Sequence, residues 1–139
     1  IPFPYRTLHA YPHMRPQDVA IWNRYILANP DRFKQVFYDY HLGENCDHGE
    51  NETECVGCGF HDVCRWKCDV IAYGDGIIYA IEIKPDAGAK AIGQAIVYKT
   101  LFELQEKPNV PIVAVILTDT IAPLTKLIAH AHGVELWQA

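Results

Sequence analysis

The sequence of 139 residues predicts a mixed α/β (α+β) fold with the element order αβββαβαβ. An Asp-Gly pair at positions 75 and 76 separates two apolar runs, which predicts a β-hairpin over residues 65–84. A helical stretch then leads into the continuous apolar run 111–118, which is typical of a strand buried on both faces. We therefore expect a mixed central sheet flanked by helices on both faces.

Length and composition predict a single globular domain over residues 1–139. Half of the residues are hydrophobic, and the chain is long enough to bury a core. The formal net charge of −5 argues against a large non-specific basic surface, but metal ions bound to carboxylates would change the local field and permit a nucleic-acid partner. No apolar run reaches the length of a membrane span and no signal peptide is visible, so we expect a cytoplasmic protein with no membrane partner.

The chain is expected to begin with an arm and a helix. Residues 1–15 are rich in Pro, His and aromatic residues and predict an irregular arm that packs on the domain, with an aromatic grip on a substrate strand as the alternative. A helix is predicted over residues 16–29, because proline suits its first position and Asn29-Pro30 ends it. Apolar residues recur at helical spacing at Val19, Trp22 and Ile26.

A strand and a cysteine-rich insertion precede the hairpin. The strand is predicted over residues 32–42, with Val36, Tyr38 and Tyr40 alternating onto one face. Residues 43–64 break this pattern, because they are rich in glycine and contain six acidic residues but no Lys or Arg. We interpret them as a loop inserted between two strands.

The hairpin turn sets the register of its two strands. A two-residue type I′ turn requires φ > 0 at both Asp75 and Gly76. Counting outward from this turn places Asp69 directly opposite Glu82. Lys84 is two residues beyond Glu82 and therefore points to the same face. The sequence thus predicts that two carboxylates and a lysine converge on one side of the sheet.

The remainder of the chain predicts two helices and two strands. Pro85 is expected to end the hairpin. The helices are predicted over residues 88–106 and 122–132, and the strands over residues 111–118 and 134–138.

Asp69, Glu82 and Lys84 form a set of groups that suits metal-assisted phosphodiester hydrolysis. Two adjacent carboxylates repel each other unless a cation lies between them, and Mg²⁺ and Mn²⁺ prefer oxygen ligands. A metal held in this way polarises a phosphoryl oxygen and activates water, while a lysine orients that water or neutralises developing charge.

A cross-strand salt bridge on an exposed sheet face is the alternative interpretation of these three residues. Their expected neighbours argue against it, because charges among apolar side chains need an ion or a function. The apolar residues expected on the same face are Ile71, Tyr73, Ile78 and Ala80.

The spacing of the charged residues resembles the motif of the PD-(D/E)xK nuclease superfamily. Asp69 is followed by twelve residues and then by Glu82-x-Lys84. Gln94-x-x-x-Tyr98, on the helix after the hairpin, is similar to the Gln/Tyr signature (QxxxY) of the RecB-like branch. The order αβββαβ also matches the core of this superfamily, so the resemblance implies a restriction-endonuclease-like fold.

The resemblance implies roles for the matched residues of the hairpin. Asp69 and Glu82 would bind a catalytic Mg²⁺ or Mn²⁺ ion, together with the backbone carbonyl of Ile83. Lys84 would be the catalytic lysine that assists the attacking water.

Residues on the two predicted helices would support this site. The resemblance implies that Gln94 and Tyr98 support it or contact DNA, with ordinary packing of the helix on the sheet as the alternative. Many members of the superfamily carry a further acid on the first helix, and Asp18 is the only acid in the helix predicted here.

Three basic residues are candidates for contacts with nucleic acid. Arg65 and Lys67 alternate onto the face of Asp69, and Lys90 shares the helix face of Gln94. They would touch phosphate and position the substrate without reading its bases. Solvated side chains at the end of a strand are the alternative for Arg65 and Lys67.

The five cysteines lie close together and predict a metal site in a reducing compartment. Four ligands are needed from seven candidates, and we select Cys46, Cys55, Cys58 and Cys64 for zinc, with His61 as the main competitor for the fourth place. His48 is the remaining histidine of this stretch, and Cys68, which stands where the nuclease motif often has proline, is expected to point opposite Asp69 into packing. An iron–sulfur cluster is the alternative to zinc, and free or disulfide-bonded cysteines are the alternative to a metal.

The acidic insertion should repel DNA phosphate. We therefore expect the zinc site to stabilise a long loop that has little core of its own, and it would also suit a protein partner.

These patterns together predict a Mg²⁺- or Mn²⁺-dependent DNA nuclease with a structural zinc, either endonuclease or exonuclease, in a phage, plasmid or repair setting. Its partners would be DNA and either another protein or a second copy of the chain. The alternative is a non-catalytic, zinc-stabilised interaction or assembly module of the same fold.

Overall fold

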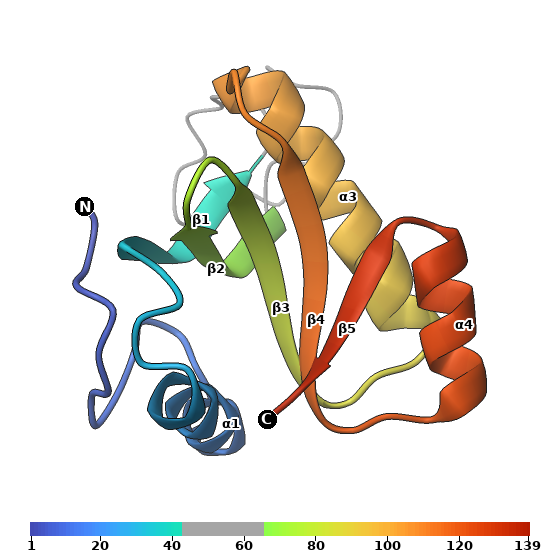
Figure 1. The fold of residues 1–139 in the computed structure, drawn as a ribbon, viewed down its shortest axis with the longest axis horizontal. Coiled ribbons are helices and arrows are strands. Elements are labelled where there is room, and N and C mark those ends of the chain that lie inside the picture. The colour runs from blue at the N-terminus through green and yellow to red at the C-terminus, as the bar shows by residue number, and fades with distance from the viewer. Residues whose placement is uncertain (43–65) are drawn as a thin grey trace, which may run out of the picture.

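The computed structural model describes residues 1–42 and 66–139. Within them, five strands form one sheet in the order β1-β2-β3-β4-β5 (Figure 1). The first three strands are antiparallel neighbours, and the last two join in parallel, so the sheet is mixed as predicted. The strands are β1 (Gln35–Leu42), β2 (Trp66–Tyr73), β3 (Ile78–Asp86), β4 (Ile112–Thr120) and β5 (Val134–Gln138).

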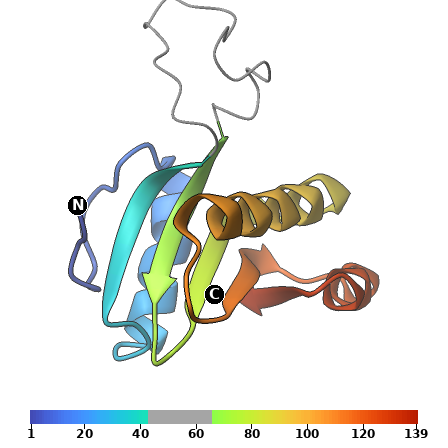
Figure 2. The same ribbon diagram turned by 90° about the horizontal axis from the view of Figure 1, so that it is seen from above.

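Helices cover both faces of this sheet (Figure 2). Helix α1 (Pro16–Ala28) packs on one face through Trp22, which belongs to the same buried cluster as Val70 of β2. Helices α3 (Ala89–Glu106) and α4 (Pro123–Ala131) pack on the other face. Because α3 connects two parallel neighbours, β3 and β4, it is the crossover that the sequence predicts.

Strand β4 lies at the centre of the core and is buried on both faces. Val115 and Leu117 face the α1 cluster, whereas Ala114 and Ile116 belong to the cluster under α3 and α4. This double burial explains why β4 reads as a continuous apolar run.

The N-terminal arm packs along the free edge of β1, as expected. Phe3 pairs with Val36 as an antiparallel bridge, with hydrogen bonds in both directions. The Tyr5 hydroxyl donates to the Asn29 carbonyl at 2.7 Å, and Tyr11 is buried. The arm therefore covers the edge of β1 at Val36.

The β2–β3 hairpin has the predicted register, with pairs running from Tyr73/Ile78 to Val70/Ile81. Its turn differs from the prediction, because Gly76 has a positive φ of 69° but Asp75 does not. The carboxylate of Asp75 instead forms an ion pair with Lys34 at 2.8 Å. The pairing is therefore that of a two-residue turn, but the turn is not type I′.

Two further expectations for the strands are wrong. Strand β3 continues through Pro85 to Asp86, because no β2 residue pairs with it there and the missing N–H breaks no ladder on that side. In β1, Tyr38 packs on Trp22 of α1, whereas Tyr40 packs on Phe102 of α3. Asp39, between them, has a φ of 50°, which turns the strand and reverses its faces.

The insertion and its proposed zinc ligands lie outside the described residues. The proposed ligands are Cys46, Cys55, Cys58 and Cys64, with His61 as the alternative; His48 and the candidate nucleic-acid contact Arg65 also lie outside the described residues. Cys68 is described and is fully buried, in the cluster that contains Leu42 and Phe102. None of the helices in the described part of the chain is long and apolar enough to cross a membrane.

Candidate active site

The candidate site lies where β2 and β3 separate. The ladder between them ends at Val70 and Ile81. In a continued antiparallel ladder, the Ile83 N–H would donate to the Cys68 carbonyl. The Asp69 carboxylate accepts this hydrogen bond instead, through Oδ2 at 2.8 Å. The fork therefore holds a carboxylate between two strands.

Glu82 lies beside this fork with its side chain almost fully buried. Glu82 is only 5 % exposed, and its Oε2 atom has no hydrogen-bond partner. The other oxygen, Oε1, is 3.5 Å from the ammonium nitrogen of Lys84, whose side chain is 39 % exposed. The site thus combines a buried carboxyl group with a cation that reaches solvent.

Burial and mutual repulsion make both carboxylates hard to ionise. Burial raises the pKa of Asp69 to about 6, the Ile83 N–H opposes this shift, and Asp18 adds to it. Burial, and then the charge of Asp69, raise the pKa of Glu82 to about 8, and Lys84 lowers it. The structure therefore brings together the three residues that the hairpin register predicts.

Helix α3 places Tyr98 against this cluster. Tyr98 is buried, and its pKa is raised by burial and then by the charge of Glu82. The ring of Trp66 packs edge-on against Tyr98, with 5.5 Å between the centroids. Gln94 is one turn earlier, and its Oε1 atom is buried without a hydrogen-bond partner.

Helix α1 brings Asp18 to the other side of the cluster. Asp18 is half-buried, and burial raises its pKa, whereas the Arg15 N–H and the charge of Lys84 lower it. Its own charge contributes to the raised pKa of Asp69. Asp18 is therefore electrostatically part of the site.

Asp39 is a neighbour of the site that sequence reasoning missed. Its side chain is 12 % exposed, and its charge also raises the pKa of Asp69. Oδ2 of Asp39 is 3.4 Å from Nε2 of His13 and 3.6 Å from Nε2 of His41. In the β1–β2 register, Tyr38 pairs with Val70 and Tyr40 with Cys68, which places Asp39 beside Asp69, but no sequence signal fixes this register.

The described candidates for nucleic-acid contacts are exposed. Lys67 lies in β2 directly opposite His41, and Lys90 lies in the first turn of α3. Neither forms an ion pair within the described residues. Both side chains therefore remain candidates for such contacts on the described surface.

The chemistry of the donor atoms fits a single divalent cation at the fork. Among residues 1–42 and 66–139, no group of three or more His, Cys, Asp or Glu side chains is placed to hold a metal ion. The predicted donor set needs only two carboxylates, because its third member is the Ile83 carbonyl. The unpartnered Oε2 of Glu82 is the group that a cation would satisfy.

Cys68 lies next to Asp69 but is not available as a ligand in its present state. Burial, and then the charges of Glu82 and Asp69, raise the pKa of its thiol well above the usual value. The Sγ atom lies 3.4 Å from the Val70 carbonyl and 3.5 Å from the Ile81 carbonyl. The thiol therefore packs as a neutral group behind the fork.

The comparisons with known proteins identify a fold. The sequence matches no family model and no curated protein. Its structure is similar to that of a repair endonuclease from Pyrococcus abyssi, with a TM-score of 0.54 and 18 % identity over 94 % of this chain and 49 % of that one. The small subunit of the heterodimeric restriction endonuclease R.BspD6I is also similar, with a TM-score of 0.41 and 14 % identity over 78 % of this chain and 53 % of that subunit. The likeness to the repair endonuclease shows that the chain has a restriction-endonuclease-like fold. The chain spans about half the length of each of these two proteins.

Proposed function

We propose that this protein is a metal-dependent nuclease that hydrolyses phosphodiester bonds in DNA. The observation that best supports this function is Oε2 of Glu82, a buried carboxylate oxygen without a hydrogen-bond partner. Its carboxylate has a raised pKa because of burial and the adjacent Asp69. A divalent cation would pair with both carboxylates and remove their repulsion. Metal binding would therefore explain why two adjacent carboxylates are buried despite the energetic cost.

Asp69, Glu82 and the carbonyl of Ile83 would hold the cation. When bound, a Mg²⁺ or Mn²⁺ ion supplies a Lewis acid for a phosphoryl oxygen and lowers the pKa of a bound water. The Asp69 carboxylate is oriented for this role by the Ile83 N–H. Lys84 can donate hydrogen bonds to the attacking water and to a phosphate oxygen, because its ammonium group lies at the edge of the site and reaches solvent.

Other residues would support this chemistry. Tyr98 and Gln94 would contact the site from α3, and Asp18 would add a third carboxylate from α1. Lys67 and Lys90, with Arg65, would contact backbone phosphates on the surface around the site.

The fold supports the proposal at a general level. The repair endonuclease that shares the fold is named for a nuclease activity, but it is 18 % identical to this chain. The proposal for this chain therefore rests on its own carboxylates and lysine.

Nuclease assays of single variants test the proposal. Wild type and the Lys84→Ala and Glu82→Ala variants are incubated with DNA and either Mg²⁺ or Mn²⁺. We expect wild type to cleave and each variant to lose at least about 10²-fold in kcat, because each lacks one part of the catalytic set. Lys126→Ala and Glu103→Ala are matched controls, since they remove the same charges from exposed positions on α4 and α3.

Two outcomes contradict the nuclease proposal: a wild type that cleaves nothing, or variants that cleave as well as wild type. The acidic insertion and the net charge of −5 favour the second candidate function, a non-catalytic assembly module. Calorimetric titration with Mn²⁺ separates the two functions. The nuclease binds Mn²⁺ with an affinity that Glu82→Ala abolishes, whereas the assembly module takes up none.

We also propose that the insertion binds zinc through Cys46, Cys55, Cys58 and Cys64. Elemental analysis of the purified protein should give one zinc per chain, and Cys55→Ser should remove it. Iron in place of zinc, or no metal, contradicts this assignment.

A further inference from the structure

Thr118 is a buried polar residue next to the candidate catalytic lysine. Among the described residues, it and Glu82 are the two polar or charged residues that are buried, at 0 % and 5 % exposed. In the parallel ladder of β3 and β4, Thr118 pairs with Lys84. Its hydroxyl lies 3.1 Å from the Pro85 carbonyl and 3.1 Å from the Thr120 carbonyl.

The end of β3 depends on this side of the sheet for support. Beyond Ile81, no β2 residue pairs with β3, so within the described part of the chain residues 82–86 pair with β4 alone. Pro85 has no N–H and cannot donate to the ladder. The one hydrogen of the Thr118 hydroxyl is shared between the Pro85 and Thr120 carbonyls, and its bond to Pro85 links the strand to β4 directly after Lys84.

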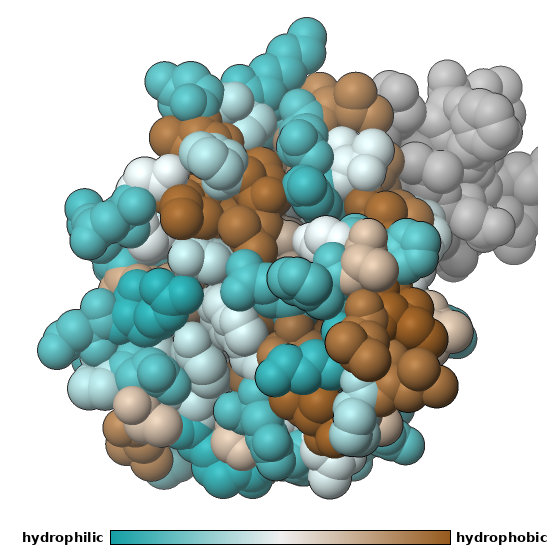
Figure 3. All heavy atoms as spheres, turned by 45° about the vertical axis from the view of Figure 1, so that its right-hand side comes forward, coloured by the Kyte–Doolittle hydropathy of each residue, from teal (hydrophilic) through white to brown (hydrophobic). Residues whose placement is uncertain are grey.

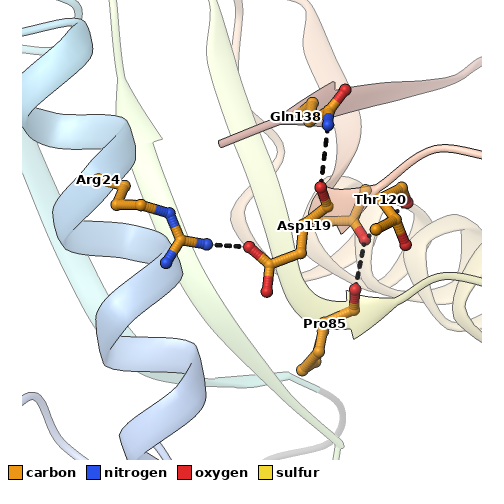
Figure 4. A network of polar contacts seen from close by, with 6 residues as sticks. Arg24, Pro85, Asp119, Thr120 and Gln138 are labelled. Atoms are coloured by element: carbon orange, nitrogen blue, oxygen red, sulfur yellow. Dashed lines mark hydrogen bonds and ion pairs between the residues drawn. The ribbon is translucent and has the colours of Figure 1, made fainter.

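The residue after Thr118, Asp119, is linked by polar contacts to Gln138 of β5 and to Arg24 of α1 (Figure 4). The Ala139 N–H donates to the Thr118 carbonyl at 3.0 Å, and the Gln138 side-chain amide donates to the Asp119 carbonyl at 3.0 Å. The Asp119 carboxylate forms an ion pair with Arg24 of α1. The end of β5 and helix α1 therefore both fix the segment that carries the Thr118 hydroxyl.

We propose that Thr118 is a positioning residue for Lys84. Its hydroxyl holds the Pro85 carbonyl and so fixes the backbone from which the Lys84 side chain reaches Glu82. This inference rests on the proposed nuclease function of Lys84. A misplacement of roughly 1 Å in a catalytic group can lower a rate by about 10²-fold. Loss of this one hydroxyl can therefore lower the cleavage rate measurably.

Three variants isolate the hydroxyl. Thr118→Val keeps the shape and β-branching but removes the donor, and Thr118→Ser keeps the donor. Thr100→Val is the matched control, because its hydroxyl donates to the Ile96 carbonyl at 2.9 Å on the exposed side of α3. We expect Thr118→Val to lower kcat by about 10- to 100-fold with KM unchanged, Thr118→Ser to recover most of this loss, and Thr100→Val to behave as wild type.

A double-mutant cycle distinguishes positioning from general damage. If Thr118 acts through Lys84, Thr118→Val should have little further effect on the residual single-turnover rate of Lys84→Ala. Equal losses from Thr118→Val in the presence and absence of Lys84 would overturn the proposal. A rise in KM with kcat unchanged would overturn it as well.

Amide hydrogen exchange tests the same inference without relying on nuclease activity. In Thr118→Val, exchange at Lys84 and Asp86 should accelerate by about tenfold relative to Ile81 and Val115, and Thr118→Ser should restore it. Uniform acceleration, or none, overturns the positioning role. The two proposals can fail separately. If wild type cleaves no DNA but Thr118→Val still shows this local acceleration, the nuclease function is refuted and the role of Thr118 in holding the backbone stands.

Discussion

Glu82 shows at the scale of one residue how the site trades stability for function. A buried carboxyl group next to a second one is costly to ionise. Burial and the charge of Asp69 raise the pKa of Glu82 for this reason. One of its oxygens is unpartnered, whereas the two oxygens of an exposed glutamate would be hydrated. The cation of the proposed nuclease would offset this cost, because it would pair with the unpartnered oxygen.

The raised pKa of Glu82 predicts how stability changes with pH. Its pKa is about 8 in the folded protein and close to the ordinary value of 4.5 in the unfolded chain. Between these values the folded state holds the extra proton, so the free energy of unfolding of the metal-free protein should fall as pH rises from 4.5 to 8. Asp69 acts in the same direction up to pH 6.

Urea unfolding in EDTA across this pH range measures the effect. Glu82→Gln removes the ionisation, so it should flatten the pH dependence and stabilise the protein at pH 8 by roughly a few kcal/mol, while abolishing cleavage. Glu103→Gln, an exposed position on α3, should leave the slope unchanged. A wild type whose stability rises between pH 5 and pH 8 would show that Glu82 ionises freely.

The hairpin is the element that sequence reasoning predicted best. The Asp-Gly pair led to the correct register, and counting from it predicted that Asp69, Glu82 and Lys84 lie close together. The ladder ends at Val70 and Ile81, so Asp69 binds the Ile83 N–H and does not pair with Glu82. The turn type was wrong because Asp75 keeps a negative φ and pairs with Lys34, a contact from a distant part of the chain. Local sequence thus determined the pairing but not the backbone of the turn.

Strand β1 shows where this reasoning stops. The prediction that Tyr40 shares a face with Tyr38 was wrong because Asp39 takes a positive φ. A positive φ is rare for a residue other than glycine, and the alternation of apolar residues does not reveal it. No short turn joins β1 to β2, so there was no point from which to count their register. For the same reason Asp39 escaped notice as a neighbour of Asp69.

The end of α3 gives a prediction at the scale of one helix. Lys107 caps this helix in the left-handed conformation, with a φ of 46°, and its N–H donates to the Glu103 carbonyl. Because glycine adopts this conformation without a steric penalty, Lys107→Gly should raise the free energy of unfolding by roughly 0.5–1 kcal/mol.

Thermal or urea unfolding of Lys107→Gly tests the cap. The same change within a helix, Lys126→Gly in α4, should have the opposite effect and destabilise by about 1 kcal/mol. Destabilisation by Lys107→Gly would mean that the lysine side chain contributes more than the backbone conformation costs.

At the scale of the whole molecule, charge dominates the approach of a substrate. The net charge of −5 and the carboxylates Asp18, Asp39, Asp69 and Glu82 around one site repel a polyanion. The order of elements and the layered sheet follow from the sequence pattern. The approach of Asp18 and Asp39 to the site does not, because it depends on how α1 and β1 pack.

For the proposed nuclease, this charge balance predicts that DNA binding requires a divalent cation. Fluorescence anisotropy with the Lys84→Ala protein should show weak binding of labelled DNA in EDTA and at least about tenfold tighter binding with Mn²⁺. Glu82→Ala should lose this enhancement, whereas Glu103→Ala should keep it. Equally tight binding in EDTA would place the DNA on a surface remote from the carboxylates.

The mixed pairing of β3 has a further consequence, for the order of folding. Its contacts with β2 are local, and an isolated hairpin closes in about 1–10 μs, whereas its contacts with β4 must wait for the whole of α3 to cross over. Because non-local pairing is the slow step, we expect Asp69 and Glu82 to meet early and Thr118 to arrive late. Substitutions in the turn should then slow refolding, and substitutions at Thr118 should mainly speed unfolding.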